Sequence, residues 1–148
     1  MPFVTFEPKR HGGPLYLRFA PDGQSLLVTA VLRVMPGTVQ DQAIVESPTI
    51  IGALDFAPEG FGPYGGQLSV TEVGYYEIPV PLGQALRADG KVHRVHLEGK
   101  LEMIASGFIN PWCLRLVGNQ MWVGDINGDF IYGKRELPDG FIVTLTPH

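Results

Sequence analysis

The most constraining feature of this 148-residue sequence is a two-strand pattern that occurs three times. Each copy begins with alternating apolar residues, breaks at a short turn and continues with a β-branched run, which is typical of a β-hairpin. The hairpins are predicted over residues 15–30, 52–72 and 112–125. Val28, Val70 and Val123 mark equivalent places in the second strands, at intervals of roughly 40 to 55 residues. The chain is therefore predicted to contain three copies of one small β unit.

Further strands are predicted outside the hairpins. Residues 90–98 and 100–106 would add a third and a fourth strand to the second repeat, and residues 139–147 would add a third strand to the last. A fourth strand is missing there, because the sequence ends. The outer part of the first repeat, around 37–45, gives the weakest signal. Residues 2–7 form a predicted strand ahead of the first repeat, which could complete the last one.

The composition agrees with a β protein. Glycine (19) and proline (13) are abundant while charged residues make up only 18% of the chain, a balance that favours short strands joined by turns. The net charge of −4 argues against a nucleic-acid partner, because phosphate binding needs clustered lysine and arginine. No apolar run is long enough to span a membrane, and the first residues do not resemble a signal peptide, so we expect a cytoplasmic protein. Cys113 is the single cysteine, and we expect it to be buried as a small hydrophobic side chain.

The repeat spacing is typical of β-propeller blades. We predict one propeller-like domain over 1–148, with four-stranded blades at about 12–48, 50–107 and 108–148. Propellers usually contain four to eight blades, so three would leave two apolar faces uncovered. A homodimer that closes a six-bladed ring would cover both faces. The alternative is a single β-sandwich or barrel in which the three repeats are coincidental.

The third repeat resembles a blade of six-bladed propellers of the glucose/sorbosone dehydrogenase type, and of their relatives with NHL or SMP-30-like (senescence marker protein) repeats. These proteins carry an Asn-Pro-Trp after a glycine and a Val-Gly-Asp at the end of the next strand. The matching residues here are Gly107, 110–112 and 123–125. The second repeat resembles the preceding blade over residues 55–95. The resemblance implies a propeller fold of which this chain would supply about half.

The resemblance does not extend to dehydrogenase chemistry. Quinone-dependent members have an arginine directly before the Asn-Pro, where this chain has Ile109. The histidine base and the basic residues that hold the quinone cannot be matched one by one in this sequence. We therefore predict no catalytic residue, since unrelated functions share the propeller fold.

A calcium-like pattern follows the third hairpin. Asp125, Asn127, Asp129 and Glu136 have the spacing of oxygen ligands in an EF-hand loop. The glycine that such a loop needs at its sixth position is Phe130 here, and no helix is predicted on either side. Two interpretations stay open: a calcium site in a β-connection, or turn residues whose side chains bond the local backbone.

The ends of the predicted strands suggest a second kind of site. Lactonases of the SMP-30-like group bind a divalent ion through glutamate, asparagine and aspartate side chains above the central channel. The resemblance implies Glu72, Asn110, Asp125 and Asn127 as a corresponding set, to which the calcium pattern adds Asp129.

Aromatic and histidine residues complete the candidates. A ligand pocket could be lined by Tyr64, Tyr75, Tyr76 and Trp112. The alternative is that these aromatic rings pack between blades or across a dimer interface. His93 and His96 lie three residues apart on a predicted strand, so they point to opposite faces and cannot share one metal ion. We expect both to be exposed.

The sequence therefore predicts a propeller-type binding or scaffold protein, without catalysis and with an unidentified small-molecule ligand. The alternative is a metal-dependent hydrolase or lactonase with a divalent ion such as calcium. A third hypothesis is a propeller-derived fold that has kept its stability without any activity.

Overall fold

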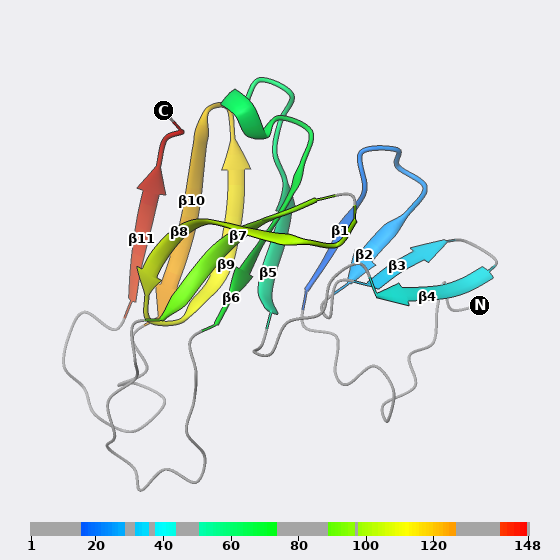
Figure 1. Ribbon diagram of the computed structural model, residues 1–148, viewed down its shortest axis with the longest axis horizontal. Coiled ribbons are helices and arrows are strands. Elements are labelled where there is room, and N and C mark those ends of the chain that lie inside the picture. Colours follow the sequence, from blue (N-terminus) through cyan, green and yellow to red (C-terminus); the bar gives the residue numbers. More distant parts are fainter. Residues whose placement is uncertain are drawn as a thin grey trace, which may run out of the picture.

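The computed structural model is an all-β protein built from three small antiparallel sheets, as predicted from the hairpin repeats (Figure 1). The structure describes residues 16–28, 32–35, 38–43, 51–73, 89–96, 98–126 and 140–147. Within these ranges there is no α-helix, and one short 3-10 turn, η1, covers Gly62–Tyr64. None of the helical residues in these ranges forms a segment long and apolar enough to cross a membrane.

The first sheet contains four consecutive strands in the order of the chain: β1 (Leu17–Phe19), β2 (Leu26–Val28), β3 (Leu32–Met35) and β4 (Thr38–Ala43). A tight turn joins β1 to β2. Asp22 holds this turn, because its carboxylate accepts hydrogen bonds from the backbone N–H groups of the two residues that follow Gly23. This is the local backbone bonding that makes aspartate a turn former.

The second sheet has the same simple order: β5 (Ile51–Phe56), β6 (Leu68–Glu72), β7 (Gly90–Val95) and β8 (Leu101–Phe108). Each strand pairs antiparallel with the next along the chain. The turn η1 lies in the connection between β5 and β6.

The third sheet contains three described strands: β9 (Pro111–Val117), β10 (Gln120–Ile126) and β11 (Gly140–Leu145). β10 lies in the middle, and its pairing with β9 shifts register between Gly124 and Asp125. The strand predicted at 2–7 lies outside the described residues.

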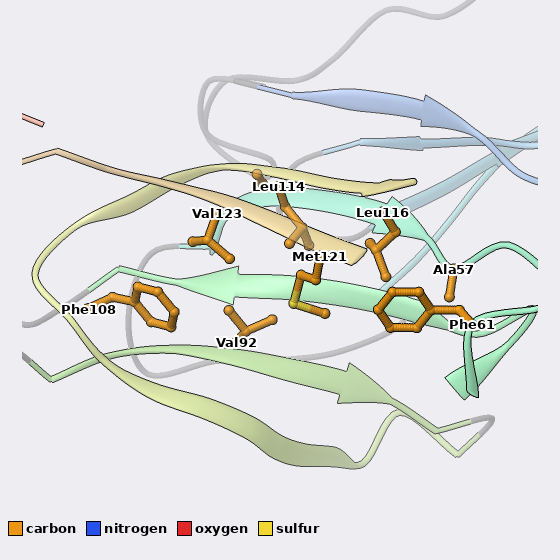
Figure 2. Close-up of a cluster of buried hydrophobic side chains, with 9 residues drawn as sticks. Ala57, Phe61, Val92, Phe108, Leu114, Leu116, Met121 and Val123 are labelled. Atoms are coloured by element: carbon orange, nitrogen blue, oxygen red, sulfur yellow. The ribbon is translucent and has the colours of Figure 1, made fainter. Parts of the chain in front are cut away.

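The second sheet is the middle layer of the molecule (Figure 1). One apolar cluster fills the space between it and the third sheet, where side chains of β9 and β10 meet Val92 and Phe108 (Figure 2). A second cluster lies on its opposite face, where Leu27 of β2 meets Leu54 and Val70. All five residues of β6 are buried as a result. β6 nevertheless alternates apolar and polar residues up to Thr71, whose buried hydroxyl accepts a hydrogen bond from the Ala53 backbone N–H at 2.8 Å.

The first strands of the second and third sheets lie side by side. Asp55 near the end of β5 contacts Leu116 near the end of β9, and Gly52 lies against Pro111 at the beginning of β9, so the two strands run in the same direction. A Cβ atom on Gly52 would come within 2.6 Å of the Pro111 carbonyl oxygen. Glycine at this position is what allows the two backbones to approach.

The outer layers each expose apolar side chains. On β1, Leu17 and Phe19 are 57% and 61% exposed. On the third sheet, Ile142 is 73% exposed and Trp122 is 45% exposed, and Cys113 is exposed beside them. The expectation that Cys113 is buried is therefore wrong for the single chain, because its strand turns alternate residues away from the core.

We expect Gly52→Ala to destabilise the protein by about 1–3 kcal/mol, because the added methyl group would overlap the Pro111 carbonyl. Gly60→Ala is the matched control, since nothing lies within 4 Å of the position of its added methyl group. The control should be neutral or stabilising by up to about 1 kcal/mol. Urea unfolding measures both changes, and equal stability of the two variants would contradict this account of β5 and β9.

Candidate functional site

Three of the predicted metal ligands lie at the same end of the sheets. Glu72 is the last residue of β6, Asn110 directly precedes β9, and Asp125 is close to the end of β10. Glu72 pairs with Ile51 at the beginning of β5, beside the contact between Gly52 and Pro111. Asn127 and Asp129 lie outside the described residues.

Asp125 is bonded to the backbone of the connection between β8 and β9. Its Oδ2 accepts a hydrogen bond from the backbone N–H of Ile109 at 2.9 Å, and its Oδ1 accepts one from the N–H of Asn110 at 2.5 Å. The N–H of Ile126 in turn donates to the Asn110 carbonyl at 3.0 Å. Both oxygens of the Asp125 carboxylate thus hold the β8–β9 connection against β10, at the point where the β9–β10 pairing shifts register.

Asn110 carries an unsatisfied side chain. It is 0% exposed, and neither its Oδ1 nor its Nδ2 has a hydrogen-bond partner. Leaving a buried polar group unpaired costs about 1–3 kcal/mol, so such a group calls for an explanation. Of the three residues at this end of the sheets, it is the one whose side chain has no bond to the protein.

Glu72 is held by two basic side chains on β7. Its Oε2 lies 2.6 Å from Nε2 of His93 and 3.8 Å from Nζ of Lys91. His93 is buried, so the expectation that it is exposed is wrong: both faces of the second sheet are covered, and Glu72 contacts Nε2 of the ring while Nδ1 has no hydrogen-bond partner. His96 contacts a different acid, as expected for the opposite face.

Within the described ranges, no group of three histidine, cysteine, aspartate or glutamate side chains could hold a metal ion.

A polar cluster that the sequence analysis missed joins the first strands of all three sheets. Asp55 on β5 lies between Arg18 on β1 and Arg115 on β9, with Oδ1 3.1 Å from Arg18 Nε and Oδ2 3.5 Å from an Arg115 terminal nitrogen. The same Oδ2 accepts a hydrogen bond from the Leu116 backbone N–H at 3.0 Å. The signal that could have revealed the cluster is the repeat itself, since the three charged residues occupy the same place in each copy.

The ring of Tyr64 lies beside a charged group. The guanidinium of Arg94 is 5.2 Å from the centre of that ring, and the ring of Phe61 is 6.4 Å away. Trp112 is half-buried near the beginning of β9, at the opposite end of the sheets from η1. Tyr75 and Tyr76 lie outside the described residues. An open cleft between the first and second sheets is lined by neither Tyr64 nor Trp112.

Glu102 on β8 bridges two bases at the rim of that cleft. Its carboxylate pairs with Arg94 and lies 2.7 Å from Nε2 of His96. Hydrogen bonds from Arg94, and to a smaller extent from His96, hold the pKa of Glu102 below its ordinary value. These contacts join β7 to the edge strand β8 of the second sheet. Among the described residues, neither a nucleophile nor a second acid contacts the Glu102 carboxylate.

No known protein-family model matches this sequence, and no curated protein is significantly similar to it. The geometry of the sheets and of these polar clusters is therefore the basis for assigning a function.

We expect Glu102→Gln to flatten the dependence of stability on pH. Because the pKa of Glu102 is lower in the folded chain than in the unfolded one, its contribution is complete above the unfolded-state pKa and is lost as the pH falls through the folded-state pKa. The difference between wild type and variant should be largest near neutral pH and vanish in acid. Glu98→Gln, which removes one exposed charge nearby, is the control. Urea unfolding at several pH values measures the effect, and parallel profiles would contradict it.

Proposed function

We propose that this protein is a non-catalytic binding protein of the β-propeller type, and that two copies assemble into a six-bladed ring. The observation that carries the proposal is that the middle sheet and the two outer sheets differ in how much apolar surface they leave exposed. The middle sheet is covered on both faces, whereas the two end sheets each leave large apolar side chains uncovered. A ring of sheets has no end layer, so closure would cover both surfaces.

The topology of the sheets supports blades. Each sheet is a simple meander, and its first strand is an edge strand that lies beside the first strand of a neighbouring sheet. In a propeller, the first strands of the blades surround a central channel and the later strands lie progressively outward. β1, β5 and β9 would be these inner strands, and Asp55 links them.

A second copy of this chain is the proposed partner for the end faces. The exposed face of the third sheet contains Cys113, Val117, Trp122, Ile126 and Ile142. The exposed apolar residues of β1 are Leu17 and Phe19. In a two-fold dimer, the third sheet of each copy would pack on the first sheet of the other, repeating the sheet-on-sheet packing already present twice within one chain. Apolar surfaces of this kind commonly mark association sites.

A binding role without catalysis is favoured by how the buried acids are used. Asp125 bonds two backbone N–H groups, Glu72 contacts His93 and Lys91, and Asp55 joins two arginines. Each carboxylate is thus engaged in holding strands or connections together. A small ligand bound at the centre of the ring would meet polar side chains of the inner strands.

The dimer interface can be tested with one charged substitution. We expect the wild type to have twice the chain mass of 16.2 kDa by light scattering at micromolar concentration, and Ile142→Lys to be a monomer. Burying an unpaired ammonium group in an apolar interface is strongly unfavourable. Met103→Lys is the matched control, because Met103 is an exposed apolar residue on β8, outside the proposed interface.

The thiol of Cys113 gives a second readout. It should react slowly with a thiol reagent in the wild-type dimer and rapidly in Ile142→Lys, since it lies on the same face of the third sheet. A wild type that stays monomeric, with a rapidly reacting Cys113, would refute the ring.

The alternative function, a metal-dependent hydrolase or lactonase, is favoured by one observation. The buried amide of Asn110 has no partner, and its own backbone N–H donates to Asp125. An amide oxygen beside a carboxylate is suitable for calcium. A site there would also use residues beyond those the structure describes, such as Asn127 or Asp129.

Calcium binding separates the two functions. For the binding protein, we expect the melting temperature to be the same in excess calcium and in EDTA. A calcium site would add about 2.7 kcal/mol of stability at a hundredfold excess over the dissociation constant. Calcium-dependent stabilisation that is lost in Asn110→Ala would favour the hydrolase. Asp22→Ala, which removes an exposed acid from a turn, controls for nonspecific ion effects.

A further inference from the structure

The charged cluster on the first strands contains more positive than negative charge. Arg18, Asp55 and Arg115 occupy the same place in the three repeats, and the structure brings them together through the single carboxylate of Asp55. Two guanidinium groups and one carboxylate give these three side chains a net charge of +1. The backbone N–H of Leu116 also donates a hydrogen bond to Asp55, so the carboxylate combines this bond with two ion-pair contacts.

Among the described residues, Asp55 is the one acidic contact of both guanidinium groups in this cluster. A guanidinium has five N–H donors in a planar fork. Nε of Arg18 lies 3.1 Å from Asp55 but is not oriented for a hydrogen bond, and this buried nitrogen lacks a hydrogen-bond partner. The Arg18 guanidinium also lies over the ring of Tyr16, 5.9 Å from its centre. The contact of Arg115 with Asp55 is long, at 3.5 Å, and its side chain is 56% exposed.

We propose that Arg18 and Arg115 bind a small organic anion through a carboxylate or phosphate group. Either group presents two or more oxygens in the geometry that a guanidinium fork recognises with paired hydrogen bonds. Asp55 would hold the two arginines and prevent them from repelling each other. A metal cation is excluded as the occupant by the net positive charge of the cluster.

This inference deepens the proposed function, because it names the class of ligand. It rests on the propeller arrangement in one respect, the position of the site at a central channel. In the two-fold ring, four arginines and two aspartates would surround that channel. The cluster itself belongs to one chain, but Arg115 lies between Cys113 and Val117 on the face proposed for dimerisation, so the mass of each variant is measured by light scattering beside its binding.

Titration calorimetry at constant ionic strength tests the proposal, with inorganic phosphate and succinate as probes and chloride as the balancing ion. We expect saturable binding of at least one probe to the wild type, and the probe that binds more tightly identifies phosphate or carboxylate as the preferred group. Arg115→Gln should weaken binding about tenfold or more, because it removes charged donors. Arg115→Lys should give an intermediate affinity, since it keeps the charge and loses the fork.

Lys100→Gln is the matched control, because it removes one positive charge from an exposed position outside the cluster, and it should bind like the wild type. Arg115 is largely exposed, so its substitution should preserve folding, which the unfolding midpoint checks. Equal affinities of Arg115→Gln and Lys100→Gln, or no saturable binding of either probe, would overturn the anion site. Binding by a protein that scatters as a monomer would support the anion site while refuting the ring.

Discussion

A small β-sheet with apolar residues on both faces must be covered on both faces, and this requirement shapes the molecule. The second sheet meets it by lying between the first and the third, with a separate apolar cluster on each side. The packing depends on close contact between β5 and β9, which Gly52 permits by lacking a side chain against Pro111. The same requirement applied to the outer sheets leads to the proposed ring, because a stack of three sheets leaves two faces without a neighbour.

The edge strands pose the second physical problem. An edge strand leaves backbone N–H and C=O groups unpaired, and proteins protect such edges with charged side chains. Here β1, β5 and β9 are edges that meet, and Asp55 satisfies one free N–H of β9 while it attracts arginines from β1 and β9. The same side chain therefore ties the three sheets together and concentrates positive charge where they meet. The Asp55 carboxylate therefore has two roles, one in holding the sheets together and one in positioning the arginines for the proposed anion binding.

The acids at the strand ends show that residue type alone does not determine which contacts a carboxylate makes. Asp125 and Glu72 are suitable metal ligands by type, and they do lie at the same end of the sheets. Their oxygens are nevertheless used by backbone N–H groups and by His93 and Lys91. Asn110 is the exception, because burial without a partner leaves its amide available. The alternative proposal of a calcium site at this end of the molecule thus depends on Asn110 more than on the acidic pattern.

The sequence by itself determined the strands. Alternation, turn residues and the repeat predicted the hairpins and most outer strands, because these features depend on neighbours along the chain. Tertiary structure decided which faces are covered: His93 is buried because sheets pack on both sides of β7, and Cys113 is exposed because its face has no neighbour in the single chain. It also decided that Arg18, Asp55 and Arg115 form one cluster. The repeat shows that the three residues occupy equivalent positions, but whether these positions are in contact depends on how the separate sheets pack together.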